Sequence, residues 1–431
     1  MNGTNPSKDT VKNMAEMMEI YALDGEEDKV FRRIASIDGA TYIDLCNKAG
    51  EQVKITPIGY EIILSIHSPA NFLKTSRQQE LPRPVANGQL GGLADFFHLE
   101  SLDDLILIIA WMVMALNTHG PYPLLVVQGP QGSGKTNCCK GICDLIDPAF
   151  PSIESFPSSE RNFLVCADNS HVMAFDNIST VSDRMSDILC RISTGGGRSS
   201  RELYSNGEVH GTDCKNPIIL NGITDPLTRP DACERSLNIK TAIIPPEKRL
   251  PEEELRKKWA ELKPGFLGAL YNAVSMAMRN LDAVKLTSYP RMADFAKFIV
   301  AAEPALPWDS GMFLKAYENN RMQIIDNAIE ADPVATAVQK LIQACGQWAG
   351  TPSDLLSTLN QYTSLEIRRL NIWPKMPNSL SGKLSRCSTF LRAQGINIIS
   401  GKTAGQRYIG IHSTLPVLHT AVPSVPPTPI E

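Results

Sequence analysis

The chain has 431 residues, of which 43% are hydrophobic and 20% are charged, and its formal net charge at pH 7 is −4. This length allows about two to four domains that each bury a core, and the composition is that of an ordinary soluble globular protein. The charge excludes a molecule that is basic as a whole, so any contact with nucleic acid needs a local basic surface.

The N-terminal residues, one apolar run and the cysteines indicate where the protein resides in the cell. Residues 1–10 are polar and lack the apolar centre of a signal peptide. Residues 105–116 are continuously apolar, but this run is shorter than the roughly 20 residues that cross a bilayer, so it predicts a buried helix. The ten cysteines include no Cys-x-x-Cys pair, which favours reduced structural thiols over zinc ligands. We therefore expect a cytoplasmic protein without membrane contact.

The N-terminal part reads as a small β-rich domain over residues 1–92. Its first 25 or so residues are expected to be loosely ordered, and residues 30–45 predict two strands about the turn dipeptide Asp38-Gly39. A second turn at residues 47–50 leads into another strand at 53–55. Prolines at 82 and 84 and the glycines that follow them predict a linker.

A phosphate-binding loop is predicted next. Residues 129–136 fit G-x-x-x-x-G-K-[ST] and directly follow the apolar run 124–127. The loop consists of Gly129, Pro130, Gln131, Gly132, Ser133, Gly134, Lys135 and Thr136. Its glycines let backbone N–H groups turn toward phosphates, Lys135 supplies a mobile charge, and the Thr136 hydroxyl can hold Mg²⁺. The alternative is a glycine-rich turn that carries Lys-Thr by chance. The apolar run before the loop and a helical pattern after it favour nucleotide binding, with ATP and Mg²⁺ as cofactors.

The region 93–330 alternates between strand and helix patterns. Such alternation predicts a three-layer α/β sheet with its ligand at the strand ends. Helices at 265–281 and 291–302 are expected to form a lid behind the nucleotide. The predicted strands are 124–127, 163–165, 172–175, 218–220 and 237–243.

Two of these strands end in polar residues. Asp176 is a candidate Walker B acid that holds Mg²⁺ through water, and a cap of the next helix is the alternative. Asn177 follows it, and an amide orients water but cannot take its proton, so another carboxylate serves as base or hydrolysis is slow. Asn221 suits a sensor of phosphate or water, although Asn221-Gly222 also fits a turn.

Arginines mark two further segments. Residues 189–204 are glycine-rich and contain Arg198 and Arg201, which would meet a polyanion unless the loop is merely solvated. Arg229 and Arg235 flank a short predicted helix. In a ring ATPase such arginines reach a neighbour's nucleotide, whereas in a monomer they would pair with nearby acids such as Asp231 or Glu234.

The region 331–413 predicts three helices, at 335–348, 352–362 and 379–394, followed by a hairpin at 396–411. This is the order of a winged helix. Residues 366–413 contain eight basic residues and one acidic residue, a local charge of about +7. DNA is therefore favoured over a protein partner. Residues 414–431 predict a disordered, proline-rich tail. The candidate DNA contacts are Lys383, Arg386 and Arg392 on the third helix, and Lys402 and Arg407 beside the wing.

The order of these motifs resembles that of superfamily III helicases and of the helicase portions of phage and mobile-element primase-helicases. The order is the phosphate loop, the strand that ends in Asp, the segment Thr-Gly-Gly-Gly-x-x-x-Arg-x-Leu-Tyr at 194–204, and the strand that ends in Asn. The resemblance covers roughly residues 93–243. It implies an AAA+ core, Asp176 as the Walker B acid, Asn221 as sensor 1, Arg229 or Arg235 as a trans-acting finger, and residues 194–204 before a DNA-gripping pore hairpin. Asn177 and Gly197 depart from residues common in that family.

The sequence thus predicts a P-loop ATPase, namely a ring-forming DNA helicase or translocase of a phage or mobile-element replication system, and the family resemblance implies that the ring is a hexamer. The rival hypothesis is an initiator or nucleic-acid-sensing ATPase, of a regulatory or defence system, that uses ATP as a switch without unwinding DNA. Asn177 favours the rival, because slow hydrolysis suits a timer better than a motor. No cluster of acidic metal ligands in the N-terminal part supports priming activity.

Overall fold

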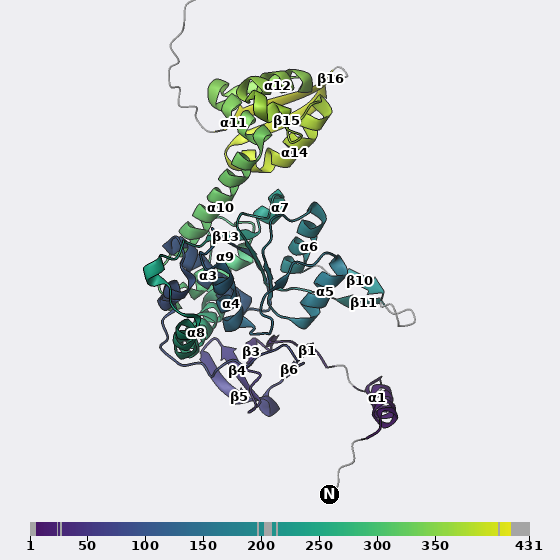
Figure 1. Ribbon diagram of the computed structural model, residues 1–431, viewed down its shortest axis with the longest axis vertical. Helices are drawn as coiled ribbons and strands as arrows, with labels where there is room; N and C mark the ends of the chain where they lie inside the picture. The colour runs from purple at the N-terminus through teal and green to yellow at the C-terminus, as the bar shows by residue number, and fades with distance from the viewer. Residues whose placement is uncertain are drawn as a thin grey trace, which may run out of the picture.

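The computed structural model describes residues 6–23, 25, 28–195, 198–201, 209–212, 214–403 and 406–414. A central α/β body lies between a small N-terminal sheet and a C-terminal region, which α10 joins to the body (Figure 1). None of the described helices is both long enough and apolar enough to cross a membrane.

The central sheet has five parallel strands in the order β13-β7-β12-β9-β8. Every residue of β7 is buried, as expected when helices cover both faces of a parallel sheet. This arrangement confirms the predicted mixed α/β class with a parallel sheet. The strands are β7 (Leu124–Gln128), β8 (Glu154–Ser155), β9 (Met173–Asp176), β12 (Ile218–Gly222) and β13 (Ser236–Lys240).

Alternate side chains of β7 enter two different cores. Leu125 and Val127 belong to a core with α3 (Leu102–Ala115) and α4 (Lys135–Ile146), whereas Leu124 and Val126 pack with α5 (Glu160–Asn169) and α6 (Asp183–Thr194). The sheet therefore lies between two helical layers, because successive strand residues point to opposite faces. The buried helix predicted at 105–116 is confirmed as α3.

One predicted strand is wrong. Phe163 lies in α5, whose N-terminus is capped by the Ser159 hydroxyl accepting from the Asn162 N–H. Only Phe163 and Ala167 are buried in this helix, a spacing of four residues. A short apolar run does not distinguish a strand from such an amphipathic helix. The strand predicted at 237–243 ends earlier, at Lys240.

Helices α2 (Ala94–Phe97), α8 (Glu252–Asn280), α9 (Ala293–Ala302) and α10 (Met312–Ala331) complete the body. The predicted helices at 265–281 and 291–302 are confirmed as α8 and α9, although α8 starts 13 residues earlier, at Glu252. Helix α10 was not predicted from the sequence. Its Asn320 side chain bonds the backbone of Asn238 in β13 in both directions, which fixes the helix to the sheet.

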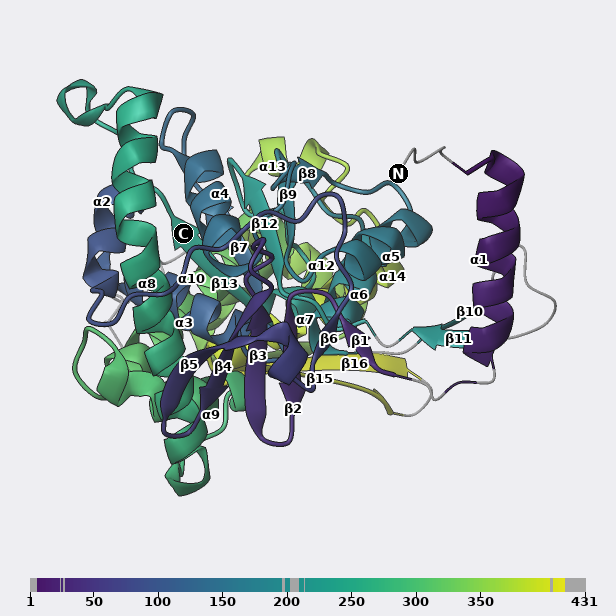
Figure 2. The same ribbon diagram turned by 90° about the horizontal axis from the view of Figure 1, so that it is seen from below.

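The N-terminal sheet has the order β2-β3-β4-β5, and a short parallel pair, β1 with β6, lies beside it. Asp38 and Gly39 have φ of 49° and 73°, which confirms the predicted tight hairpin turn. The expected loose order is wrong for Lys8–Leu23, which form the helix α1, exposed along its length and set apart from the body in both views (Figure 2). The strands are β1 (Val30–Phe31), β2 (Ile34–Ile37), β3 (Ala40–Asp44), β4 (Glu51–Thr56), β5 (Gly59–Leu64) and β6 (Asn71–Phe72).

The predicted linker after this sheet is packed against the body. Leu81 is buried, and the Val85 N–H donates to the Pro264 carbonyl of α8 at 2.8 Å. A Cβ at Gly88 would lie 1.9 Å from the Gly265 carbonyl oxygen, so no other residue fits there without movement. Residues on both sides of this segment contribute to one continuous hydrophobic core.

The C-terminal region combines helices with the antiparallel sheet β14-β16-β15. The three predicted helices and the hairpin are confirmed, except that the first helix ends at Cys345 and the last two residues of its predicted range begin β14; β14 and the short α13 were not predicted. Of the predicted tail, residues 415–431 lie outside the described part of the chain. The elements are α11 (Pro333–Cys345), β14 (Gln347–Gly350), α12 (Pro352–Leu359), α13 (Leu365–Arg369), α14 (Pro377–Ala393), β15 (Ile396–Thr403) and β16 (Gln406–Ser413).

Candidate nucleotide-binding site

The loop 129–134 connects the end of β7 to the start of α4. Gly132 and Gly134 have φ near 80°, in the left-handed region that glycine adopts without strain. A Cβ at Gly129 would come within 2.3 Å of the Thr241 hydroxyl. The glycines of the motif are therefore required by backbone shape and by close packing.

Thr241, just after β13, fixes the loop. Its hydroxyl lies 2.7 Å from the Ser133 hydroxyl and bonds the Gln128 carbonyl, and both hydroxyl residues are fully buried. No sequence pattern points to Thr241, because it lies 105 or more positions from the loop in the chain and belongs to no motif. It is a positioning residue, since it touches the loop through Ser133 and Gln128.

Lys135 begins α4, and its ammonium group donates to the Pro130 carbonyl at 2.8 Å. The Lys135 side chain thus folds back over the loop 129–134. Phosphate oxygens are stronger acceptors for an ammonium group than a peptide carbonyl is, so an entering phosphate competes well for this hydrogen bond.

Thr136, Asp176 and Asn221 come together beside the loop, as the sequence predicted for three separate segments. The Asn221 amide donates to Asp176 Oδ1 at 2.6 Å and to Thr136 Oγ1 at 3.3 Å, and Thr136 Oγ1 lies 3.4 Å from Asp176 Oδ2. The helix cap that was the alternative role for Asp176 is supplied instead by Ser182, which caps α6. The strand order causes this meeting, because β12 lies between β7 and β9.

The cluster also has unused bonding capacity. Asn221 is 1% exposed, and its Oδ1 atom has no hydrogen-bond partner within the described chain. A buried amide oxygen without a partner costs free energy unless water or a ligand supplies a donor. Carboxylate, hydroxyl and amide oxygens at one place are ligands of the kind that Mg²⁺ and its bound waters prefer, so these residues fit a magnesium-nucleotide complex.

Asn177 is exposed and has a φ of 57°. Among residues with a side chain, asparagine tolerates this left-handed conformation best, whereas glutamate would be strained there by about 1 kcal/mol. The backbone N–H of Asn177 donates to Asp176 Oδ1 and so helps to orient that carboxylate. Backbone shape is thus a physical reason for an amide at this position.

Three cysteine thiols near the site are buried in the core, and burial determines their protonation state. Cys138, Cys139 and Cys143 lie on the inner face of α4, and burial raises the pKa of each thiol well above its usual value. These thiols therefore stay protonated and serve as small apolar core residues. No group of three metal-ligating side chains of the His, Cys, Asp and Glu types occurs in the described ranges.

Arg235 lies away from the phosphate loop, at the opposite end of β7. Arg229 and Arg235 flank α7 (Pro230–Cys233), which precedes β13, and the Arg235 carbonyl accepts from the N–H of Leu124 at the start of β7. The loop follows the other end of β7, about 16 Å away at the usual rise per strand residue. Arg229 pairs with Asp187 of α6 at 3.1 Å, and Arg235 pairs with Asp231, as the monomer alternative predicted for the second arginine.

Arg198 and Arg201 belong to β10 (Arg198–Arg201), which forms an antiparallel hairpin with β11 (Val209–Thr212). The loop predicted at 189–204 is wrong for residues 189–194, which end the helix α6 with Leu189 and Ile192 buried, and residues 198–201 form a strand of the hairpin instead of a loop. Gly197 lies outside the described residues, as do 202–208.

The basic residues of the C-terminal region divide into two sets. Lys402 and Arg407 are directly opposite each other on β15 and β16 and line a groove against α14. Lys383 and Arg386 lie on α14 but do not line this groove, and Arg392 is exposed near the end of the helix.

Two family models match most of the chain. The model described as "Actinomycete integrative conjugative element replication protein" matches residues 89–326, more than half of the chain, and the "AICE RepA C-terminal domain" model matches residues 334–421. The first match contains the complete loop and the Thr136, Asp176 and Asn221 cluster. No curated protein matches the sequence.

Solved structures give only weak likenesses. An apo structure of the NrS-1 C-terminal region (305–718) is 14% identical with a TM-score of 0.38, over 87% of this chain and 96% of that one. The A-form apo structure of the NrS-1 C-terminal region is 12% identical with a TM-score of 0.37, over 85% and 94%. JCV helicase is 11% identical with a TM-score of 0.25, over 53% and 64%. At these scores the likenesses carry no argument about this chain.

Proposed function

Because this chain belongs to the family of actinomycete integrative conjugative element replication proteins, we propose that it is an ATP-dependent DNA helicase or translocase that works as a ring of about six subunits. One observation supports the ATPase step above all. Asn221 holds Asp176 at 2.6 Å beside Thr136 and keeps an unpartnered oxygen of its own. The proposed architecture is an AAA+ core with a C-terminal winged helix.

In this proposal the loop N–H groups and Lys135 bind the phosphates of ATP, and Thr136 and Asp176 hold Mg²⁺. The metal would supply charge neutralisation between the phosphates. Asn221 positions the attacking water through its amide and stabilises the Asp176 carboxylate. Asn177 lies one residue further along and orients water without accepting its proton.

The ring is supported by the position of the arginines. Arg235 lies at the far end of β7, about 16 Å from the loop of its own subunit and beyond the reach of its side chain, so a contact of its guanidinium with phosphate requires a neighbouring subunit. The partners of both arginines, Asp187 and Asp231, are partly exposed, and exposed ion pairs of this type are worth only about 0.2–1 kcal/mol. Either arginine can therefore leave its partner at low cost.

We expect Arg229→Ala or Arg235→Ala to lower ATP turnover by about 10³-fold, the scale of a lost trans arginine, without preventing assembly. Turnover should be measured beside the assembly state by light scattering with ATP and DNA. Arg161→Ala, an exposed change on α5, is the matched control and should turn over at the wild-type rate. A strictly monomeric protein whose turnover ignores both changes would exclude the ring.

A second candidate function is an ATP-switched initiator that assembles on DNA without unwinding it. The conformation of Asn177 supports this candidate, because it disfavours the glutamate that would serve as a base. Strand-displacement assays on forked and tailed duplexes separate the two functions. Turnover stimulated by DNA without displacement of any of these strands favours the switch.

Asn177→Asp should raise ATP turnover by about tenfold or more, because a general base contributes roughly 10²–10⁴ to a rate and aspartate tolerates the left-handed backbone. Asn177→Gly keeps that backbone and removes the amide, so it should lower turnover or leave it unchanged. Steady-state kcat with saturating Mg²⁺ checks both. An aspartate variant no faster than the glycine variant contradicts a missing base.

A further inference from the structure

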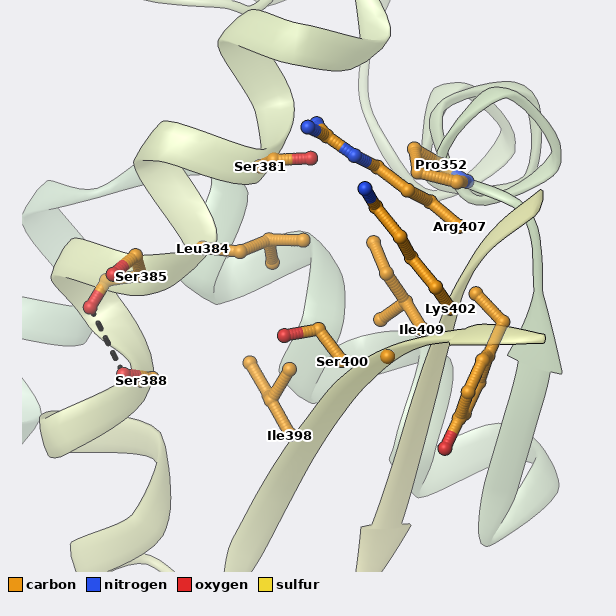
Figure 3. A pocket seen from close by; sticks show the side chains of 12 residues that line it. Pro352, Ser381, Leu384, Ser385, Ser388, Ile398, Ser400, Lys402, Arg407 and Ile409 are labelled. Carbon is orange, nitrogen blue, oxygen red and sulfur yellow. Dashed lines mark hydrogen bonds between the residues drawn. The ribbon is translucent and has the colours of Figure 1, made fainter. Parts of the chain in front are cut away.

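A groove runs between α14 and the β15–β16 hairpin of the C-terminal region (Figure 3). Its volume is about 370 Å³. The face of the hairpin that covers α14 changes in character along its length. Near the core it carries Ile396, Ile398 and Ile411, and toward the turn it carries Ser400, Lys402 and Arg407. The apolar end packs, whereas the polar end faces open space.

The opposite wall presents three hydroxyl groups beside Leu384. Ser381, Ser385 and Ser388 line the groove from α14, at a spacing of four and three residues that puts them on one helix face. Ser385 and Ser388 are joined by a hydrogen bond from the Ser388 hydroxyl to the Ser385 carbonyl. Arg392, four residues after Ser388, continues the same stripe beyond the groove.

The charges in the groove are not balanced. Lys402 and Arg407 form a directly opposed pair in the antiparallel ladder, and like charges at such positions repel each other. In Figure 3 both side chains extend from the hairpin across the groove toward Ser381 of α14. No carboxylate is among the residues that line the groove, and no ion pair of either cation occurs in the described part of the chain. An anion between them would relieve this repulsion.

We infer that this groove holds a phosphodiester of a DNA strand, with Lys402 and Arg407 on one side of the phosphate and the serine hydroxyls on the other. The assignment rests on the proposed function in taking DNA as the partner of the C-terminal region. Hydroxyl and cationic groups are common partners of phosphate oxygens, and contacts to phosphate carry no sequence information. The groove therefore binds the backbone independently of sequence.

This placement differs from the sequence-based expectation that the third helix reads the major groove. The helix face with Ser381, Ser385 and Ser388 is turned toward the hairpin, and the basic residues of the other set, Lys383 and Arg386, are on a different face. If those two residues enter a major groove, they add sequence preference to a backbone contact that the groove already supplies. The two sets therefore make separable contributions.

The test measures the affinity of the full chain for labelled duplexes of three unrelated sequences, without nucleotide, over a range of salt concentrations. The double variant Lys402→Gln/Arg407→Gln should weaken binding at least tenfold for all three sequences, because both cationic partners of the bound phosphate are removed. The slope of log K against log salt should fall by about one, because the two side chains together neutralise one phosphate. Ser385→Leu, which fills the groove without changing charge, should weaken binding equally for all three sequences.

The matched control is Lys340→Gln/Arg369→Gln, which removes two exposed positive charges from α11 and α13. Its affinity should stay within about twofold of wild type, and thermal melting should show that every variant is folded. Equal losses in the control and groove variants overturn the inference, because diffuse charge then explains binding. Normal DNA binding by the groove variants overturns it as well, and points to a phosphorylated or acidic protein segment.

A third arm, Lys383→Gln/Arg386→Gln, tests the rival surface. A loss confined to this variant places the DNA on the other face of α14 and overturns the groove. ATP turnover of the groove variants, measured without DNA, should equal that of wild type, because the groove is remote from the phosphate loop in the chain and in the fold. Failure of the proposed ATPase would abolish turnover in every variant, wild type included, and is therefore distinguishable.

Discussion

Asp176→Asn should lower ATP hydrolysis by about 10²–10³-fold, the scale on which a single preorganised electrostatic contact acts. Asparagine keeps the shape of the side chain and an oxygen for the Asn221 amide, which lies 2.6 Å from Asp176 Oδ1. It removes the negative charge that Mg²⁺ requires. The binding of ATP without Mg²⁺ should be unchanged, so equilibrium binding and turnover together separate a metal defect from a binding defect.

Two companion variants sharpen this result. Lys135→Ala should lose both nucleotide affinity and turnover, since its ammonium group is the mobile charge over the loop. Asp183→Asn, an exposed acid in the first turn of α6, is the matched control and should leave turnover at the wild-type level. Full turnover by Asp176→Asn would remove this carboxylate from the catalytic machinery.

Arg33→Met should lower the free energy of unfolding by about 3–5 kcal/mol, because it leaves the buried Asp147 carboxylate without its cation. The Arg33 side chain is fully buried and that of Asp147 is 2% exposed, with Nε and Oδ1 2.9 Å apart. The same guanidinium donates to the carbonyl groups of Asp44, Gln79 and Pro148. Asp147 Oδ2 in turn accepts from the N–H groups of His171 and Val172 before β9.

This ion pair connects the N-terminal sheet to the end of α4, the helix that starts at the phosphate loop. We therefore expect one cooperative transition in urea for the sheet and the central body, at a lower midpoint in the variant. Lys257→Met is the control, because Lys257 and its partner Glu253 are 71% and 68% exposed, and exposed pairs contribute about 0–1 kcal/mol. A loss for Arg33→Met no larger than that of Lys257→Met contradicts a structural role for the pair.

Local patterns in the sequence predicted much of the secondary structure. The Asp38-Gly39 turn, the buried helix α3 and the strand β7 were all predicted because their signals act over a few residues. The residues 163–165 were misassigned, since three apolar residues have no period long enough to separate helix from strand. Helix α1 was missed because its apolar residues are exposed, and the sequence offers no partner that would bury them.

In the candidate site, too, some features follow from local sequence and others only from the tertiary structure. The sequence alone predicted the loop 129–136, Asp176 and Asn221 as candidate site residues, because each motif there consists of residues adjacent in the chain. Only the tertiary structure decided how these segments meet: the strand order puts β12 between its neighbours, and the distant Thr241 locks the loop. It alone placed Arg33 against Asp147, and it turned Lys402 and Arg407 toward the serines of α14. These contacts join residues far apart in the chain, and their energy depends on burial and on exact distance, neither of which a local pattern encodes.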